Sequence, residues 1–306
     1  MEKIVIVSGV RTAIGTFGGA FKTVPASDLG AEVIREAVRR AGIRPEQVDE
    51  VVMGCIGQIG EDAYLARVSA VKAGLPKETT AQTVNRLCSS GLQAIVTGAA
   101  AIQTGMAEIV VAGGAENMSR YPFLSRDTRY GSRLGHSTLE DALLRVLSDP
   151  FENIHMGITA ENLAVEHGIT REEQDQFALE SQRKAWAAIQ AGKFKSQIVP
   201  VTVRQRKGKE TVVDTDEHPK PDTTLEGLSR LSPAFKKDGT VTAGNASGLN
   251  DGAAAVVLMS ESKAKELGLK PLASIVGAAA AGVRPSHMGE GPIPAVRRVL
   301  ERTGLS

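Results

Sequence analysis

The feature that most limits the fold is a regular alternation of short apolar runs and amphipathic stretches over residues 3–112. The apolar runs are predicted as strands and the amphipathic stretches as helices. Predicted strands cover 3–8, 49–54, 81–85 and 108–112, and predicted helices cover 27–40, 63–73 and 92–105. This order is typical of a layered α/β domain with a mostly parallel sheet, because helices cross over between parallel strands.

Size and composition narrow the class further. The chain has 306 residues, of which 32 are glycine and only 4% aromatic, which suits helices packed closely on a sheet. That length exceeds one usual hydrophobic core, so two domains or one domain with a large insertion are expected. Lys and Arg number 36 against 35 Asp and Glu, so no overall charge favours nucleic acid or a membrane surface.

Cysteines and targeting signals indicate the compartment. The sequence has only 2 cysteines, which argues against a disulfide framework and indicates a reducing environment. The first predicted strand begins at Lys3, which leaves no room for a signal peptide, and no apolar run approaches the length of a bilayer span. We therefore expect a cytoplasmic protein that does not bind membranes.

The regular rhythm ends at Asn117. From Asn117 to Ala243 the sequence is polar and irregular, with a predicted helix at 171–191 and a predicted hairpin formed by 198–203 and 211–213. Residues 204–209, between the two strands of the hairpin, are interpreted as a solvated turn. So long a departure between strands of a sheet indicates a lid or a binding insertion.

The chain then returns to the sheet. A turn rich in Asn, Gly and Asp at 245–252 leads into a predicted strand at 253–259, followed by a strand at 271–281 and a helix at 292–302. One strand and one helix cannot bury a core of their own, and they should expose an apolar face. We expect an N-terminal half-domain (1–116 and 246–270), an inserted loop domain (117–245) and the incomplete start of a C-terminal half-domain (271–306).

The stretch from Val84 to Gly91 carries the candidate chemistry. Cys88 lies between a predicted strand and a predicted helix, and we expect it in the first turn of that helix. Unpaired N–H groups and the positive dipole end of a helix stabilise a thiolate, which would lower the pKa of the thiol and make its sulfur a nucleophile. Free cysteines are also often buried packing residues, and the local pattern leaves both interpretations open.

A second loop contains glycines and a cysteine. Gly54, Gly57 and Gly60 are spaced G-x-x-G-x-x-G, which differs from the G-x-G-x-x-G of dinucleotide-binding loops. We therefore do not expect nucleotide binding at this loop, and we interpret Cys55 as a packing residue.

Several motifs follow one another in the order found in one enzyme family. They are Arg11–Gly19, Val84–Gly91, Gly113–Ser119, His155–Gly157, Asn245–Ala253, His287–Gly289 and Gly291–Pro292. Together they resemble the thiolases, the acetyl-CoA acetyltransferases in particular, over essentially all 306 residues. The resemblance implies the layered thiolase-like fold, and the joint occurrence of the motifs favours Cys88 as a nucleophile.

The resemblance implies an enzyme that forms or cleaves a carbon–carbon bond. Cys88 would take an acetyl group from one acyl-CoA as a thioester, and a second acetyl-CoA, deprotonated at its methyl carbon, would attack it to give acetoacetyl-CoA. The reverse reaction would be CoA-dependent thiolysis, and the Cys88 N–H would stabilise the oxyanion. The resemblance also suggests a homodimer or homotetramer that uses CoA thioesters as substrates, without a resident cofactor or a metal.

By the same resemblance, the insertion would bind CoA. Family positions that line the pantetheine and adenosine path correspond here to Leu147, His155, Met156, Phe235, Ala243 and Ser247. Lys220 stands where many relatives carry an arginine near the nucleotide, and it keeps the charge but not the planar fork of that side chain.

The sequence departs from the family pattern in the second half. Thiolases carry there an Asn-Glu-Ala-Phe segment, a Gly-His-Pro segment whose histidine activates the nucleophile, and a Cys-x-Gly segment whose cysteine moves the substrate proton. None of these occurs here: only His218 precedes a proline, in unrelated surroundings, and no cysteine follows Cys88. A positioned acid or base supplies about 10² to 10⁴ in rate, so we expect this chain to acylate poorly and not to condense.

Three interpretations remain. The favoured interpretation is a thiolase whose 306 residues are a fragment or a truncated form of a longer enzyme. A condensing enzyme of the ketoacyl-synthase type would share the layered fold and the cysteine nucleophile. A non-catalytic CoA-binding or assembly subunit would depend on another polypeptide for the second half.

Overall fold

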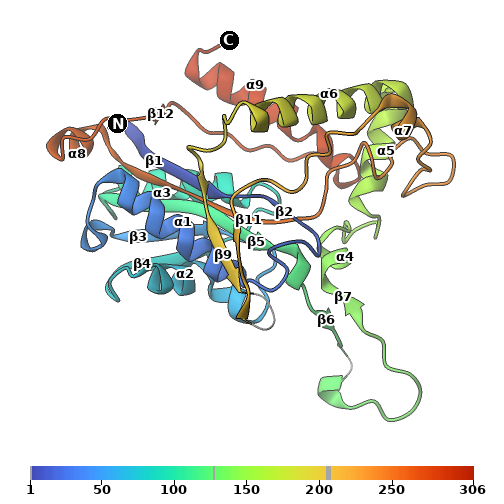
Figure 1. Ribbon diagram of the computed structural model, residues 1–306, viewed down its shortest axis with the longest axis horizontal. Helices are drawn as coiled ribbons and strands as arrows, with labels where there is room; N and C mark the ends of the chain where they lie inside the picture. Colours follow the sequence, from blue (N-terminus) through green and yellow to red (C-terminus); the bar gives the residue numbers. More distant parts are fainter. Residues whose placement is uncertain (1, 127, 205–207) are drawn as a thin grey trace. The chain divides into compact units, whose positions relative to one another are not determined.

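The computed structural model describes residues 2–126, 128–204 and 208–306 (Figure 1). The chain forms two compact units. The first unit comprises Met1–Arg120, Gly192–His218 and Leu249–Ala278, and the second comprises Tyr121–Ala191, Pro219–Gly248 and Ala279–Ser306. These borders divide the chain differently from the three predicted domains, whose assignment stays a prediction.

Within the described residues, the first unit contains an eight-stranded sheet with the main path β12-β1-β11-β5-β3-β4. Its strands are β1 (Ile4–Thr12), β2 (Gly15–Thr16), β3 (Glu50–Gly54), β4 (Thr80–Val84), β5 (Ile109–Asn117), β8 (Ile198–Val199), β11 (Asn250–Ser260) and β12 (Ala273–Ile275). Strand β3 pairs in parallel with β4 and β5, whereas β11 runs antiparallel to both β1 and β5.

The prediction of a mostly parallel sheet was therefore wrong, because the sheet is mixed. Strand β11 enters between β1 and β5 after the long excursion that follows β5, and no crossover helix joins it directly to either neighbour. A long connection without a crossover helix does not force a strand to run parallel to its neighbours, so β11 can pair antiparallel. Strand β12 is also antiparallel to β1, and it is regular over only three residues of the predicted strand 271–281.

Helices cover both faces of this sheet (Figure 1). Helices α1 (Ala26–Ala41) and α2 (Leu65–Ala73) share a buried apolar cluster with Val51 and Met53 of β3. Val52 lies between Val51 and Met53 in β3, so its side chain points to the opposite face of the sheet. On that face it shares a second buried cluster with helix α3 (Ser90–Gln103). The sheet is thus the middle layer of the first unit.

Helix boundaries differ from the predictions by a few residues. Helix α1 begins after Pro25 instead of being capped by Ser27 or Asp28, and it ends as predicted at Gly42, which has a φ of 72°. Helix α2 is preceded by the 3-10 helix η2 (Gly60–Tyr64), so its α-helical part begins two residues later than predicted.

Shorter elements complete the first unit. Strands β9 (Val201–Arg204) and β10 (Glu210–Val213) form the predicted antiparallel hairpin. Residues 205–207 of its predicted turn lie outside the described residues. The remaining elements are η1 (Pro45–Gln47), η3 (Met118–Arg120) and α8 (Glu261–Glu266).

The second unit is mainly helical. Its elements are β6 (Phe123–Leu124), η4 (Thr128–Tyr130), β7 (Glu140–Asp141), α4 (Ala142–Val146), α5 (Met156–His167), α6 (Arg171–Gln190), α7 (Leu225–Ser229), η6 (Pro285–Glu290) and α9 (Pro292–Thr303). The segment η6 packs against α5, where the Asn162 Nδ2 group donates to the Ser286 carbonyl at 3.0 Å. Two ion pairs join the same elements, because Arg284 and His287 each lie 2.8 Å from the Glu166 carboxylate.

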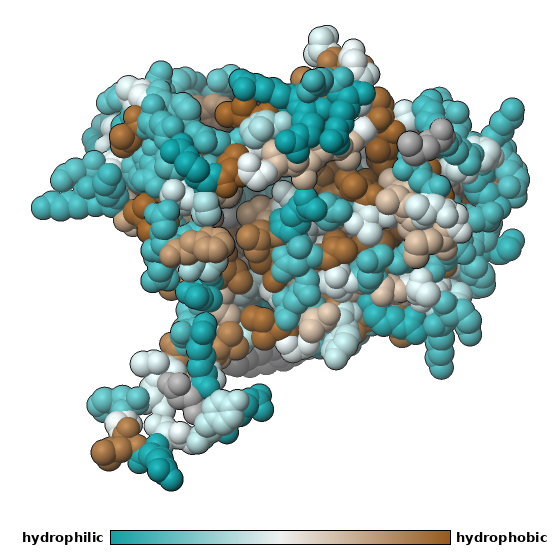
Figure 2. Space-filling model, turned by 180° about the vertical axis from the view of Figure 1, so that it is seen from behind, coloured by the Kyte–Doolittle hydropathy of each residue, from teal (hydrophilic) through white to brown (hydrophobic). Residues whose placement is uncertain are grey.

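Helix α9 leaves its apolar side chains accessible. Every residue of α9 is described and none is buried, and Ile293 and Val296 are 48% and 50% exposed. Figure 2 shows apolar groups, in brown, reaching the surface among hydrophilic ones on the face that it presents. Among the described residues, no helix is both long and apolar enough to cross a bilayer.

The start of α3 lies against the ends of two strands where glycines replace side chains. A Cβ atom on Gly54 of β3 would lie 2.3 Å from the Ser90 carbonyl carbon, and one on Gly114 of β5 would lie 3.4 Å from the Gly91 Cα atom. The backbone of α3 can therefore approach the sheet as closely as it does because Gly54 lacks a side chain, whereas a Cβ atom on Gly114 would make an ordinary contact with the helix start.

Replacing Gly54 should consequently disturb both the stability and the helix start. We expect Gly54→Ala to lower the free energy of unfolding by about 3 kcal/mol or more, because the new methyl group meets backbone that cannot move aside. Urea denaturation measures the change. Gly9→Ala in β1 is the control, since its Cβ would meet Val256 Cγ1 at an ordinary 3.4 Å. Equal stabilities of the two variants would contradict the argument.

Candidate active site

The turn that carries Cys88 is held by side-chain hydrogen bonds. It links β4 to α3, and the Asn85 Oδ1 atom accepts from the Leu87 N–H at 2.9 Å. The Ser90 hydroxyl accepts from the Arg86 N–H at 2.8 Å and donates to the Leu87 carbonyl at 2.6 Å. Leu87 adopts a left-handed conformation with a φ of 47°, which is unusual for a residue with a side chain. A tight, defined loop therefore presents Cys88.

Cys88 lies just outside the helix instead of in its first turn. Helix α3 begins at Ser90 with Ser89 as its N-cap residue, so the predicted position was wrong by two residues. The reason is the local hydrogen bonding, which keeps residues 85–89 in a turn, although the helix itself begins two residues earlier than the predicted residue 92. Cys88 is exposed, and the positive end of the α3 dipole still lies beside its turn.

Cys55 has the opposite environment. It is 1% exposed and belongs to the apolar cluster beneath α1 and α2, as expected for a packing residue. Its Sγ atom lies 3.8 Å from a Glu116 carboxylate oxygen, and this carboxylate accepts from the Ile56 and Gly57 N–H groups at 2.8 and 3.1 Å. Burial, together with the charges of Glu116 and Asp62, raises the pKa of the Cys55 thiol well above its usual range. Cys55 therefore stays a neutral thiol.

Asp62 is a partly buried carboxyl group in the same region, with an unfavourable environment for its charge. One of its oxygen atoms, Oδ1, is buried without a hydrogen-bond partner among the described residues. Burial, with the neighbouring charges of Glu61 and Glu116, raises the pKa of Asp62 from 3.8 to about 6. The ionised form of this side chain thus opposes folding at neutral pH.

Four of the residues predicted to bind CoA come together in the second unit. His155 caps α5, with its Nδ1 atom accepting from the Gly157 N–H at 3.0 Å. Its ring stacks on Phe235 with centroids 4.7 Å apart and planes inclined by 16°. The Met156 N–H donates to the Leu147 carbonyl at 2.8 Å, which fixes the segment before α5. All four side chains are partly exposed, and burial lowers the pKa of His155, which keeps it neutral at pH 7.

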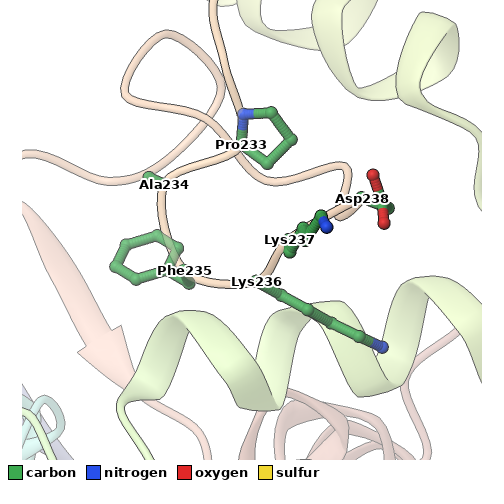
Figure 3. Close-up of a pocket in the computed structure, with 6 residues that line it drawn as sticks. All are labelled: Pro233, Ala234, Phe235, Lys236, Lys237 and Asp238. Carbon is green, nitrogen blue, oxygen red and sulfur yellow. The ribbon is translucent and has the colours of Figure 1, made fainter.

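Phe235 belongs to a loop that lines a shallow pocket. Figure 3 shows this pocket, formed by residues 233–238, with the ring of Phe235 and the side chain of Lys236 pointing to opposite sides of the loop. A Cβ atom on Gly157 would lie 2.3 Å from the Phe235 ring, so the ring occupies space that only glycine leaves open. The pocket thus combines an aromatic ring with the cationic groups of Lys236 and Lys237.

The other predicted residues lie on the surface of the second unit. Ala243 directly follows Thr242, which bridges to Pro233 beside Phe235, and is therefore close to the cluster in the fold. Lys220 and Ser247 are exposed, and no hydrogen bond or ion pair joins their side chains to that cluster in the part of the chain that the structure describes. The binding roles of all seven residues, like the role of Cys88, stay predictions.

Two buried carboxylates of the second unit were not predicted from the sequence. Glu161 and Asp175 are 2% and 3% exposed, on α5 and α6. Glu161 accepts hydrogen bonds from residues 240 and 241, and Asp175 accepts from Arg171 and Asn245. For Glu161 the sequence does contain a signal, because this charged residue lies on the same face of α5 as Gly157 and Ala164, which are both buried.

The two cysteines should differ sharply in reactivity. In native protein at pH 7.5 we expect iodoacetamide to modify Cys88 and to leave Cys55 unmodified until the protein is denatured, because Cys55 is buried and neutral. Peptide mass spectrometry identifies the modified thiol. Cys88→Ser should show no rapid labelling, and rapid modification of Cys55 in the native protein would contradict the structure.

The raised pKa of Asp62 predicts a pH-dependent stability. Between pH 3.8 and about 6 the folded protein holds a proton that the unfolded chain releases, so the free energy of unfolding falls as the pH rises through this range. Asp62→Asn should therefore stabilise the protein at pH 7.5 by about 1 to 2 kcal/mol, with little effect at pH 4. Urea midpoints at both pH values measure this, and the exposed Glu46→Gln serves as the control. A stabilisation of the same size at both pH values would be inconsistent with a titrating Asp62.

Comparison with known proteins identifies relatives over the whole chain. Residues 4–262 match the family model described as "Thiolase, N-terminal domain". The acetyl-CoA acetyltransferase of Pseudomonas aeruginosa is 52% identical over 307 residues, which cover 100% of this chain and 78% of that protein. The acetyl-CoA acetyltransferase of Cupriavidus necator is 55% identical over 303 residues, which cover 99% of this chain and 77% of that protein.

Solved structures share the fold. The crystal structure of the Bacillus anthracis acetyl-CoA acetyltransferase matches with a TM-score of 0.98 at 52% identity, over 100% of this chain and 77% of that one. A human mitochondrial 3-ketoacyl-CoA thiolase in complex with CoA matches with a TM-score of 0.95 at 46% identity, over 100% of this chain and 76% of that one. With a family model matched over most of its length and relatives at about half identity, the chain belongs to the thiolase family.

Proposed function

We propose that this protein transfers acyl groups between CoA thioesters through Cys88, as an acetyl-CoA acetyltransferase that forms or cleaves acetoacetyl-CoA. The observation that carries the proposal is the exposed thiol of Cys88 on a braced turn directly before α3, while the other cysteine is buried. Two relatives are named acetyl-CoA acetyltransferase, and a solved relative is described in complex with CoA. These names support CoA thioesters as the substrates.

The first half of the reaction is acylation of the cysteine. The Cys88 sulfur attacks the carbonyl carbon of acetyl-CoA, the bond to the CoA sulfur breaks, and the thiol proton of Cys88 passes to the leaving CoA sulfur. The dipole of α3 favours the negative charge that develops on the carbonyl oxygen, because its positive end lies beside the turn.

The second half is formation of the carbon–carbon bond. A second acetyl-CoA loses a proton from its methyl carbon, and the resulting carbanion attacks the acetyl-Cys88 carbonyl carbon. The bond to the Cys88 sulfur then breaks, the sulfur regains a proton, and acetoacetyl-CoA is released. In the reverse direction, the Cys88 sulfur attacks the ketone carbon of acetoacetyl-CoA, the carbon–carbon bond breaks, and the leaving carbanion takes a proton and departs as acetyl-CoA. The sulfur of free CoA then attacks acetyl-Cys88, the bond to the Cys88 sulfur breaks, and the CoA thiol proton passes to that sulfur.

CoA binding is assigned to the second unit. The stacked rings of His155 and Phe235, beside Leu147 and Met156, offer an apolar wall for the pantetheine arm. Ala243 and Ser247 would extend this wall, and the ammonium group of Lys220 would contact a phosphate of the nucleotide. Neutral His155 suits a site that must also accept an uncharged chain.

We expect proton transfer to limit the activity of these 306 residues. The family histidine and second cysteine do not occur in its sequence, and the remaining cysteine, Cys55, is buried and neutral. Because each positioned acid or base contributes about 10² to 10⁴ in rate, acylation should be slow and condensation slower still.

Isotope exchange tests the proposal. With acetyl-CoA and labelled free CoA, we expect slow exchange of label into acetyl-CoA and an acetyl adduct on the Cys88 peptide, both lost in Cys88→Ser. Thiolysis of acetoacetyl-CoA should be at least about 100-fold slower than by a thiolase relative assayed in parallel. Exchange that survives Cys88→Ser would overturn the role of Cys88, and thiolysis at the rate of the relative would refute the expected loss of activity.

A non-catalytic CoA-binding subunit is the second candidate. It is favoured by one observation, namely that the cluster of His155 and Phe235 is built entirely within the second unit, whereas Cys88 belongs to the first. Binding of CoA without any exchange would support this candidate. The ketoacyl-synthase interpretation is not retained, because the matching family model is that of the thiolases.

A further inference from the structure

One face of α5 holds the loop that carries Phe235. Gly157 and Glu161 are one helical turn apart, so they lie on the same face, and both are buried. Gly157 receives the ring of Phe235, since a Cβ atom there would lie 2.3 Å from the ring. The next contact along this face is made by Glu161, which is only 2% exposed.

The Glu161 carboxylate binds the backbone of the loop. It accepts from the Thr240 N–H at 2.9 Å, from the Val241 N–H at 2.8 Å and from the Thr240 hydroxyl at 3.1 Å. A Cβ atom on Gly239 would lie 2.3 Å from its Oε1 atom, so the loop passes directly over the carboxylate. A carboxylate that receives several hydrogen bonds in a buried place fixes its partners firmly.

These bonds reach Phe235 through the backbone. The Ala234 N–H donates to the Val241 carbonyl at 2.9 Å, and Pro233 bridges to Thr242. Phe235 follows Ala234 directly, and Ala243 follows Thr242. Glu161 therefore binds residues 240 and 241 directly, and the segment that leads into Phe235 is held through its backbone pairing with residues 241 and 242.

Asn245 holds the same stretch of the loop from its C-terminal side in the sequence, through residues 240 and 242. The Asn245 Nδ2 group donates to the Asp175 carboxylate at 2.9 Å and to the Thr240 carbonyl at 3.1 Å, and the Asn245 Oδ1 atom accepts from the Thr242 N–H at 2.7 Å. Because Asp175 also binds Arg171, its charge is balanced. Among the described residues Glu161 has no cationic partner, and its carboxylate accepts hydrogen bonds from the N–H groups of Thr240 and Val241 and from the Thr240 hydroxyl.

We propose that Glu161 is a positioning residue for CoA binding: its buried carboxylate keeps the loop 233–243 in the conformation that presents Phe235 and Ala243 to the ligand. The inference rests on the proposed function, because it assumes that this loop binds CoA. Ordering the loop before the ligand arrives removes an entropic cost from binding, so loss of Glu161 weakens affinity without removing any contact to CoA.

The isosteric variant Glu161→Gln tests this role. We expect the Kd for CoA, measured by titration calorimetry at 15 °C, to rise about tenfold, and amide hydrogen exchange at residues 239–242 to become faster. Glu180→Gln on α6 is the matched control, since Glu180 is exposed and its one ion pair among the described residues is with Lys184 at 2.8 Å, and it should change neither quantity. A purely structural role would lower the Tm and leave the Kd of the folded protein unchanged.

A second variant approaches the same contact from the loop. Gly239→Ala places a methyl group against the Glu161 carboxylate and should weaken CoA binding in the same direction, even if Glu161→Gln fails to fold. An unchanged Kd in a folded variant, with CoA bound normally by the wild type, overturns the role of Glu161 alone. Absence of CoA binding by the wild type overturns the proposed function, and this inference with it.

Discussion

The contact on which the first unit depends is the close approach of α3 to the carboxyl ends of β3 and β5. It requires a hydrogen atom where other residues have a side chain, at Gly54. The turn from Asn85 to Ser90, which directly precedes this helix start, is closed by its own hydrogen bonds. Cys88 is thus exposed on a braced turn beside a helix that packs closely on the sheet.

Local patterns predicted most elements of the first unit but not the direction of every strand. Periodicity and capping residues located α1, α3 and the hairpin of β9 and β10 within a few residues. The sequence could not predict that β11 runs antiparallel to its neighbours, because the direction of a strand depends on where a distant segment pairs with the sheet. The alternation of apolar residues looks the same for a parallel and an antiparallel strand. The position of Cys88 outside the helix was missed for a different reason, since the Ser90 hydroxyl donates back to the Leu87 carbonyl and keeps the residues before the helix in a turn.

The candidate binding residues came from the family resemblance, and the residues that hold them in place did not. Stacking of His155 on Phe235 joins positions eighty residues apart, which no periodicity in either segment indicates. Glu161 shows the limit most clearly, because a carboxylate on a buried helix face signals that a partner exists and not which one. Its partners lie in an irregular loop whose conformation is known only from the structure.

The hydrogen bond that caps α5 also decides what His155 can offer to a ligand. Its Nδ1 lone pair is used by the Gly157 N–H, and the ring is neutral because burial lowers its pKa. In the neutral tautomer that follows, the single imidazole proton resides on Nε2. The histidine can therefore donate to a carbonyl or phosphoryl oxygen but cannot accept from an amide or hydroxyl, so the helix terminus fixes which hydrogen bonds this side chain can make.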